Sequence, residues 1–589
     1  MSSLRRDALA GALAGLLAGL ALGWAMQTQV MMAQFSGLVG LPALGAGLVL
    51  HLGVSALVGA AFGALFRFQP RGHAAAISHG LMLGLVWWII VPLTLTPLAM
   101  GRGPTWSLAE AASSYSLLLG YLSFGGLLGF LSHLFVAGYL RRFPAPEIET
   151  DATTTLATRI VILGGGYGGL SAAQRFEHIL RRFPGVEVTL VSQSNYLLHT
   201  PMLSEVASGE LEAQHISAPL RAAIPDTQVI HATAEVIDAA ARTVNVRAHA
   251  GAPSQTIVYD HLVLAVGSVA NYYGLPGLQA HSLPLKTLAD ASRLRNHVIT
   301  QLERADVEAD EAERRAMLTF VVAGAGFAGT EMLAALHDMV HSILRYYPNI
   351  DPDEPRFVMI HSRDRILPEL SEKLAGYARA KMAARGIEFM LEVRVAGATP
   401  SAVLFKGRQP LPTRTLIWTA GSQPPPILQT LPCEHDARGA VLTDGAMRVQ
   451  GLTNVWAIGD AAAIPTPFDG GGFYPPTAQH ALREGKAVAD NIAAVLAGKP
   501  PKPFRFQAIG LLASLGTRTA VAEIRGRRFS GLLAWIMWRS IYWSKLPGAE
   551  KKLRVALDWT IDLFFPRDIV LTDDANHLPP TQVDTDRQR

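Results

Sequence analysis

The stretch Arg159-Ile-Val-Ile-Leu-Gly-Gly-Gly-Tyr-Gly-Gly-Leu170 determines the fold expected for most of this chain. It predicts a buried strand, a tight glycine turn and a helix, with Gly164, Gly166 and Gly169 in the spacing G-x-G-x-x-G. In such a turn the first glycine permits the bend, the second lets a pyrophosphate reach the backbone, and the third lets helix and strand pack closely. A lone match is weak evidence, but a second strand at residues 186–191 completes a β-α-β unit.

The same pattern returns at residues 318–329, where Gly324, Gly326 and Gly329 repeat the spacing. Its second strand is expected at residues 357–360. Two such turns, each between a strand and a helix, predict two bound dinucleotides. The fold class that we expect is therefore α/β, with two Rossmann-like domains.

Three other turns are expected to lie against the bound ligands. Strands near residues 259–268 and 415–422 each run into a small-residue turn, which contains Gly267 in the first case and Gly421 in the second. Such turns let the backbone pass close to a ligand. A third strand ends at Gly459-Asp460, whose carboxylate can accept a hydrogen bond from a sugar-alcohol hydroxyl.

The composition is apolar for a chain of 589 residues, since 50% of them are hydrophobic and only 17% are charged. The formal net charge is +4 without a long basic run, which argues against nucleic acid as a partner. Cys433 is the single cysteine, so the chain forms no internal disulfide and carries no dithiol. Disulfide reductases and sulfide-oxidising flavoproteins are therefore disfavoured, and no metal site is expected.

Most of the apolar excess lies before residue 145, in four stretches long enough to cross a hydrocarbon core of about 30 Å. Arginines gather at the ends on one side, so the positive-inside rule places both ends of this all-α bundle in the cytoplasm. No Asp, Glu or Lys lies within a stretch, so a proton path of acidic residues is absent from them. The four stretches are residues 8–30, 42–66, 77–99 and 112–137.

Small residues on the first stretch predict a close helix–helix contact. Gly11, Gly15, Gly19 and Gly23 recur every four residues on one face, which suits packing either within the bundle or between two copies in a homodimer. The apolar stretches also contain His51, His79 and His133. His79 and His133 both lie toward the cytoplasmic side and could hold a haem between them, and ordinary hydrogen bonding is the alternative.

The motifs described above, together with residues 195–209 and 259–288, resemble those of the type II NADH dehydrogenases, single-subunit NADH:quinone oxidoreductases that do not pump protons. The resemblance covers residues 158–570 and does not extend to residues 1–145. It implies FAD in the first glycine turn, NADH in the second, Gly459-Asp460 on the flavin ribityl chain and a membrane quinone as acceptor. Hydride would pass from the nicotinamide C4 to the flavin N5, and two electrons would then reach the quinone.

The resemblance also implies roles for single residues. Glu331 matches the family's acid near the nicotinamide–flavin junction, although a surface acid on the same helix is the alternative. Residues 475–484 resemble the motif that lines the quinone pocket, where Gln479 could hydrogen-bond a quinone carbonyl or the flavin edge. Arg483 and Glu484 stand where some members carry glutamine, which leaves the acceptor less defined than the flavin. The implied catalytic residues are Lys286, Glu331 and Gln479, and the implied cofactor-binding residues are Gly164, Gly166, Tyr167, Gly168, Gly169, Ser192, Gly267, Gly324, Gly326, Gly329, His361, Ser362, Arg363, Gly421, Gly459, Asp460, Ala478 and Gln479.

The electron donor is less certain than the cofactor, because an acid usually ends the second strand of a dinucleotide site and binds the ribose 2′-hydroxyl. The second site offers His361, Ser362 and Arg363 there, and the first offers Ser192 and Gln193. Without the acid a 2′-phosphate is not repelled, and Arg363 could attract one. NADH is expected on family grounds, with NADPH as the rival.

The C-terminal part predicts two amphipathic helices. Residues 530–543 are rich in tryptophan and leucine with basic flanks, and residues 550–565 place leucines on one face and charges largely on the other. Such helices suit a headgroup boundary, so we expect membrane docking that guides a quinone to the flavin. A lid packed on its own core is the alternative.

The expected location is a bacterial inner membrane, with several spans and the flavin domain on the cytoplasmic face. Two rival functions stay open: an NADPH-dependent flavoprotein reductase with a non-quinone acceptor, and a membrane redox sensor that binds FAD without turnover.

The expected organisation is a four-span domain (1–142), a linker (143–157), a FAD-binding domain in two parts (158–289 and 426–505), an inserted NAD(P)H-binding domain (290–425), a membrane-docking module (506–571) and a disordered tail (572–589).

Overall fold

The computed structural model describes residues 3–27, 44–66, 73–99, 101, 115–142, 158–180, 183, 185–468, 471–562 and 564–571. The expected linker and the expected disordered tail lie outside these residues. The chain divides into two units, one formed by residues 1–152 with 547–554 and the other by residues 153–546 with 555–589. Each unit is described by itself.

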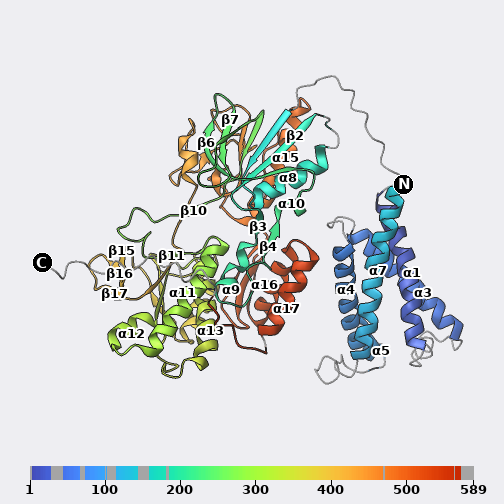
Figure 1. Ribbon diagram of the computed structural model, residues 1–589, viewed down its shortest axis with the longest axis horizontal. Coiled ribbons are helices and arrows are strands. Elements are labelled where there is room, and N and C mark those ends of the chain that lie inside the picture. The colour runs from blue at the N-terminus through green and yellow to red at the C-terminus, as the bar shows by residue number, and fades with distance from the viewer. Residues whose placement is uncertain are drawn as a thin grey trace. The chain divides into compact units, whose positions relative to one another are not determined.

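Among the described residues before 143, the first unit contains four long apolar helices (Figure 1). Each is long and apolar enough to cross a membrane, as the composition predicts. The third continues through a π-helical turn at Val91–Leu95, where Pro92 lacks the N–H that a regular α-helix needs. The helices are α1 (Ser3–Gln27), α3 (Leu44–Phe66), α4 (His73–Ile90), which extends through the π-turn into α5 (Thr96–Ala99), and α7 (Tyr115–Arg142).

Glycines bring the helices of this unit into backbone contact. A Cβ at Gly11 or Gly15 would overlap the carbonyl oxygen of Gly59 or Ser55, so α1 and α3 pack as a close pair. A second such pair is α4 with α7, where Gly80 faces the Gly125 backbone. The glycine face of α1 therefore packs within the bundle, the first of the two alternatives above. His51 Nε2 donates a hydrogen bond to the Gly19 carbonyl oxygen (2.9 Å).

A parallel five-stranded sheet begins the second unit, in the order β21-β9-β1-β2-β5. Its central strand is apolar and buried from Ile160 to Leu163, as expected for a strand covered on both faces. Helix α15 packs beside α8, the helix that follows the first glycine turn (Figure 1). The elements are β1 (Thr158–Leu163), α8 (Tyr167–Ile179), β2 (Val186–Ser192), β5 (Gln228–His231), β9 (His261–Leu264), β21 (Val455–Ala457) and α15 (Ala478–Leu496).

A second parallel sheet has the order β11-β18-β12-β13-β14 and follows the same plan. Between the two sheets the chain crosses twice, through the short antiparallel strands β10 and β19. The two Rossmann-like domains predicted from the glycine motifs are thus confirmed. The elements are β10 (Val269–Ala270), β11 (Leu283–Pro284), α11 (Leu288–Val307), β12 (Thr319–Ala323), α13 (Phe327–Ile343), β13 (Arg356–Ile360), β14 (Glu388–Met390), β18 (Thr415–Trp418) and β19 (Ser422–Gln423).

Smaller elements complete these two domains. Several charged residues follow α11, and they form a short helix, α12, which begins after the N-cap Asp310. The elements are β3 (Tyr196–Leu198), α9 (Leu203–Ala207), β4 (Ser217–Pro219), α10 (Leu220–Ala223), β6 (Thr233–Asp238), β7 (Thr243–Arg247), β8 (Gln255–Val258), α12 (Glu311–Met317), α14 (Glu372–Ala383), β15 (Val395–Thr399), β16 (Ala402–Phe405), β17 (Leu411–Pro412), β20 (Val441–Leu442) and β22 (Ala462–Ala463).

The C-terminal part contains an antiparallel sheet that the sequence pattern did not predict, followed by two helices. The first helix begins at Leu532 and not at Ser530, because Ser530 pairs with Val521 as part of a strand. The elements are β23 (Gly510–Ser514), β24 (Ala520–Ile524), β25 (Arg527–Gly531), α16 (Leu532–Lys545) and α17 (Ala549–Asp562).

Arg567 fastens the end of the chain to the rest of the second unit. Its side chain is only 6% exposed. It donates to the carbonyl oxygens of Ser208 (3.1 Å) and Ala335 (3.3 Å), and it pairs with Glu210 (3.3 Å) and Asp562 (3.1 Å). One buried guanidinium therefore joins the segment after α9, helix α13 and the end of α17.

We expect Arg567→Met to lower the free energy of unfolding by about 3–5 kcal/mol, because it leaves the Glu210 carboxylate buried with less compensation. Arg448→Met is the matched control: the Arg448–Asp444 pair is exposed, so its loss should cost less than about 1 kcal/mol. Urea unfolding of the detergent-purified protein measures both. Equal effects of the two substitutions would contradict the role assigned to Arg567.

Candidate functional site

The first glycine turn has the geometry of a phosphate cradle. Gly164 has φ +109°, and a Cβ there would overlap the Ala265 carbonyl oxygen. A Cβ at Gly169 would overlap the Gly164 carbonyl oxygen, so helix α8 starts directly against the end of β1. Gly166, the N-cap of α8, faces open space and supplies no side-chain cap. The unpaired N–H groups of the first helical turn are therefore directed at a site where an anion can bind.

The second turn repeats this geometry closely. Gly324 has φ +110°, and a Cβ at Gly329 would overlap the Gly324 carbonyl oxygen. Gly326 caps α13 without a side chain and again faces open space. Both cradles lie at the carboxyl ends of parallel strands, where open α/β sheets bind their ligands.

Three further predicted residues lie around the first cradle. Gly168 faces the Ile458 side chain, 3.0 Å from the position of a Cβ. Ser192 is buried at the end of β2, and its Oγ accepts from Ser194 N (3.3 Å). The Tyr167 hydroxyl is hydrogen-bonded to His199 Nδ1 (3.0 Å). Burial and the nearby Lys545 lower the pKa of His199 to about 4, so this histidine is neutral at physiological pH.

A polar chain joins three segments beside the first cradle. Lys286 Nζ donates to Ser268 Oγ (3.3 Å), and Ser268 Oγ donates to Asp460 Oδ2 (2.7 Å). The predicted residues Lys286, Gly267 and Gly459-Asp460 are thus brought together, although up to 192 positions separate the bonded pairs. Ser268, which holds the Asp460 carboxylate in place, was missed in the sequence.

Glu484 lies behind Gly459, a contact that the sequence analysis did not foresee. It is 2% exposed, and its Oε2 accepts from Gly459 N (2.7 Å). Burial raises the pKa of Glu484 to about 7, the Gly459 hydrogen bond opposes this, and the Asp460 charge adds to it. The Glu484 carboxyl group therefore binds the turn at Gly459 and carries a proton that can be lost near neutrality.

Glu331 does not point from α13 into solvent. Its Oε1 accepts from Ser514 N in β23 (3.0 Å) and from Trp538 Nε1 in α16 (2.9 Å). Burial raises the pKa of Glu331 to about 7, although both hydrogen bonds favour the ionised form. The acid two residues beyond Gly329 thus connects the second cradle to the C-terminal part, and Ser514 and Trp538 are partners that the sequence did not reveal.

The residues expected on the acceptor side lie at the start of α15, which begins at Ala478. One amide N–H of Gln479 donates to the Gly510 carbonyl oxygen (2.8 Å), so this side chain is partly engaged by β23. Arg483 donates to the Gln479 backbone oxygen (2.9 Å) and lies over the Phe506 ring at 4.0 Å. Arg483 therefore supports the loop before β23.

At the end of β13, where a dinucleotide site usually has an acid that binds the ribose 2′-hydroxyl, this chain has side chains that can donate hydrogen bonds. His361 Nδ1 accepts from Ala325 N (3.2 Å), within the second glycine turn. This bond leaves the proton on Nε2, which is buried and has no hydrogen-bond partner among the residues that the structure describes. Ser362 and Arg363 are exposed beside it. The three residues predicted at this position therefore lie together at the second cradle.

The turn after β18 forms a wall of the second cradle. Thr419 Oγ1 donates to the carbonyl oxygens of Ala323 and Gly324 (both 3.0 Å). A Cβ at Gly324 would lie 2.7 Å from the Ala420 backbone. Gly421, predicted to contact a cofactor, belongs to this turn, whereas Thr419, which holds it, was missed.

Two family models match the chain. "Pyridine nucleotide-disulphide oxidoreductase" matches residues 158–485, and "NDH2 C-terminal domain" matches residues 509–568. The first family is named for a dithiol reaction, but with Cys433 as its single cysteine this chain shares the fold and not that chemistry.

Individual relatives agree with these matches. The chain is 30% identical over 421 residues to a probable NADH dehydrogenase of Dictyostelium discoideum, covering 70% of this chain and 90% of the relative. It is 28% identical over 438 residues to the type II NADH:quinone oxidoreductase Ndh of Mycobacterium tuberculosis, covering 72% and 92%. The structure of NDH2 from Plasmodium falciparum in complex with NADH has the same fold, with a TM-score of 0.65 and 18% identity over 70% of this chain and 100% of that one. The resemblance inferred from the motifs is thereby confirmed, and the chain belongs to the type II NADH dehydrogenase family.

Proposed function

We propose that this enzyme is a membrane-bound, FAD-dependent NADH:quinone oxidoreductase that does not pump protons. The observation that carries the proposal is the pair of matching cradles at Gly164 and Gly324, joined through Glu331 to the residues of the acceptor side. The names of relatives from Mycobacterium tuberculosis support quinone as the acceptor. The apolar stretches of the membrane helices carry no Asp, Glu or Lys between residues 8 and 27, 44 and 66, 76 and 98, or 117 and 139, which supports the absence of a proton channel.

The first cradle fits FAD. Gly166 and Gly267 have no heavy atom within 4 Å of a Cβ position, which leaves room for a pyrophosphate and a ring to approach the backbone. The Asp460 carboxylate, oriented by Ser268, can accept from a ribityl hydroxyl. FAD held there would supply the two-electron carrier between a nicotinamide and a quinone.

Glu331 is placed to deliver a proton. NADH, one proton and a quinone yield NAD⁺ and a quinol, so one proton must enter the site. A carboxyl group with a pKa of about 7 holds such a proton near neutral pH and releases it readily. Its position between the donor cradle and the C-terminal part, fixed by Ser514 and Trp538, suits that role.

We expect flavin reoxidation by quinone to slow as the pH rises through about 7, because Glu331 loses its proton over that range. Glu331→Gln should remove this pH dependence and slow the step by about 100-fold. Stopped-flow absorbance of the pre-reduced enzyme measures the rate. Glu484 also has a pKa of about 7, so the variant Glu484→Gln tests whether the pH dependence comes from Glu484 and not from Glu331. A transition that survives in Glu331→Gln and disappears in Glu484→Gln would exclude Glu331 as the donor.

Helix α17 supports membrane docking because several of its apolar side chains are left exposed. Its protein-facing side is held by the buried Val555 and by two ion pairs, Asp558 with His215 (2.5 Å) and Asp562 with Arg567 (3.1 Å). Its apolar face is exposed together with the residues that follow the helix. The exposed residues are Leu553, Leu557, Ile561, Phe564 and Phe565.

Helix α16 has features of both alternatives for the C-terminal part, a lid packed on the protein core and a membrane-docking helix. Ala534 and Trp538 are buried in the same core as α13, whereas the apolar side chains of the opposite face are exposed. A contiguous apolar surface of this kind marks a site of membrane or protein contact. The exposed residues of α16 are Leu532, Leu533 and Ile536.

We also propose how the protein is arranged in the membrane: several spans cross a bacterial inner membrane, and the flavin domain lies on the cytoplasmic face. The basic residues beside the helices support this, because the positive-inside rule favours a cytoplasmic location for both ends of the bundle. The proposed boundaries are residues 1–142 for the spans, 158–289 with 426–505 for FAD, 290–425 for NAD(P)H and 506–571 for docking.

A fragment that lacks residues 1–142 should still pellet with lipid vesicles, since α16 and α17 present their apolar faces without the spans. Replacing Leu557, Ile561 and Phe564 by Ser should release it, because burying each side chain contributes about 1.5–3 kcal/mol. Val236→Ser with Val307→Ser, at exposed apolar positions elsewhere, is the matched control and should not change pelleting. A flavin-loaded fragment that remains in the supernatant would refute the docking role.

NADPH is the second candidate donor, favoured by the donor groups at the end of β13. The exposed Arg363 can donate to an anionic 2′-phosphate, and no acid among residues 361–363 opposes it. NADH remains the proposal because the relatives are named for it.

Anaerobic reduction of the full-length, detergent-purified protein tests the function directly. We expect NADH to bleach the flavin absorbance and a quinone to restore it. Flavin that is never reduced would indicate a sensor, and reduced flavin that a quinone does not reoxidise would indicate another acceptor. Faster bleaching by NADPH that Arg363→Leu slows selectively would replace NADH by NADPH as the donor.

A further inference from the structure

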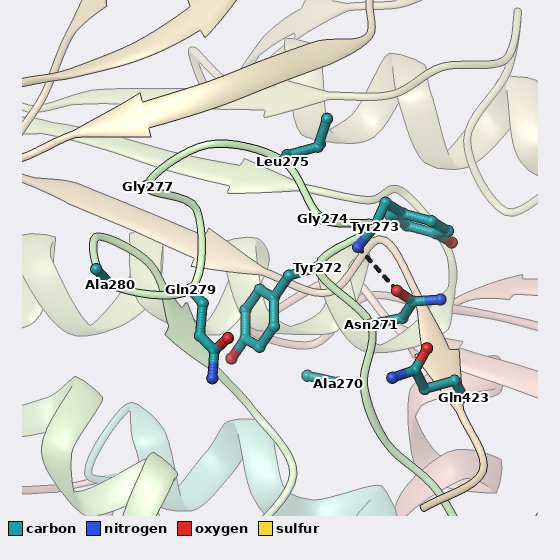
Figure 2. A pocket seen from close by; sticks show the side chains of 10 residues that line it. All are labelled: Ala270, Asn271, Tyr272, Tyr273, Gly274, Leu275, Gly277, Gln279, Ala280 and Gln423. Atoms are coloured by element: carbon teal, nitrogen blue, oxygen red, sulfur yellow. Dashed lines mark hydrogen bonds between the residues drawn. The ribbon is translucent and has the colours of Figure 1, made fainter. Parts of the chain in front are cut away.

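The segment in which the chain crosses from the first sheet to the second carries two neighbouring tyrosines, Tyr272 and Tyr273. Strands β10 and β19 pair there through Val269 with Gln423 and Ala270 with Ser422. Residues 270–275, Gly277, Gln279, Ala280 and Gln423 line a pocket of about 700 Å³ (Figure 2). Figure 2 shows the rings of Tyr272 and Tyr273 projecting to different sides of the segment.

Tyr273 has an unfavourable backbone conformation that its surroundings maintain. Its φ is +53°, in the left-handed region that a residue with a side chain avoids, and the residue is 59% exposed. Its N–H donates to Asn271 Oδ1 (2.8 Å), the dashed line in Figure 2. Residues held in this way outside favoured regions concentrate at ligand sites.

The ring of Tyr273 lies on the turn that walls the second cradle. Its hydroxyl donates to the Ala420 carbonyl oxygen (3.3 Å), and its ring meets Trp418 edge to face at a centroid distance of 6.4 Å. Trp418 Nε1 in turn donates to the Asn271 carbonyl oxygen (2.8 Å), so the crossing segment and the turn are bonded in both directions.

Gly421 leaves the space that this ring fills. A Cβ at Gly421 would overlap the Tyr273 hydroxyl oxygen and lie 2.8 Å from two ring carbons. The neighbouring Ala420 backbone lies 2.7 Å from a Cβ position at Gly324, the first glycine of the cradle. Ring, turn and cradle are therefore in contact in succession, from Tyr273 through Gly421 and Ala420 to Gly324.

We propose that Tyr273 is a positioning residue for the nicotinamide dinucleotide. By occupying the side-chain space of Gly421 and bonding Ala420, it fixes the turn at residues 419–421 against the second cradle. It acts through the turn and not by contact with the electron acceptor, so its loss weakens donor binding and leaves reoxidation by quinone unchanged. This inference rests on the proposed function of the second cradle.

The test measures flavin reduction at increasing NADH concentration, without oxygen, in the full-length enzyme. Tyr273→Ala and Gly421→Ala should each raise the apparent Kd for NADH by about tenfold. The double variant should resemble Tyr273→Ala alone, because an alanine methyl at position 421 then meets no ring; coupled residues give such non-additive effects. Tyr273→Phe keeps the ring and should show a smaller rise, and it serves as the folded variant if Tyr273→Ala does not fold.

Tyr272→Ala is the matched control, since Tyr272 lines the same pocket but its hydroxyl is not bonded to Ala420. It should leave the Kd for NADH at the wild-type value. An unchanged Kd in both Tyr273 variants, or single effects that simply multiply in the double variant, would overturn the inference while wild-type reduction by NADH stands. Failure of NADH and NADPH to reduce the wild-type flavin would instead overturn the proposed function.

Discussion

The contact between the third glycine of each cradle and the carbonyl oxygen of the first is the constraint on which the rest of the structure depends. At Gly169 and at Gly329 a single methyl group would separate the helix from its strand. With the helix N-terminus pressed onto the strand end, the unpaired N–H groups of its first turn face a common point, and that point attracts phosphate. The other groups of the site are arranged relative to these two points.

Glu331 illustrates how the two sides of the site are coupled. It follows the second cradle on α13, yet its carboxylate is held by the backbone of β23 and the indole of Trp538 in α16. The cradle and the C-terminal part pack against this carboxylate and reduce its contact with water, so its protonated form is favoured near neutrality. The same packing that closes the fold thus creates a group with the proton affinity that quinone reduction needs.

Buried ion pairs also attach the C-terminal helices to the rest of the second unit. Arg539 lies between the rings of Trp535 (4.2 Å) and Trp559 (4.5 Å) and pairs with Glu210, which Arg567 also contacts. These ion pairs help to hold the helices to the protein. Several apolar side chains of both helices are left exposed, which is unfavourable in water and favourable at a lipid surface.

The sequence by itself determined the two cradles, the α/β class and the four apolar helices, because each depends on local rules. A tight turn needs glycine, a buried parallel strand is a short apolar run, and a span needs about 20 apolar residues. The amphipathic pattern of residues 550–565 also predicted which residues share a face. What the pattern left open was whether that face meets the protein core or the solvent.

The tertiary structure alone decided the partners of the site residues. Glu331 and Ser514 are 183 positions apart, and Ser268 and Asp460 are 192 apart, so no spacing rule relates them. The strands of residues 510–531 were missed because each is short and gains its stability from pairing with the others. Tyr273 was missed for a similar reason, since its place depends on a glycine 148 residues later. Local steric rules can be applied to a sequence directly, whereas burial and long-range hydrogen bonds exist only once the chain has folded.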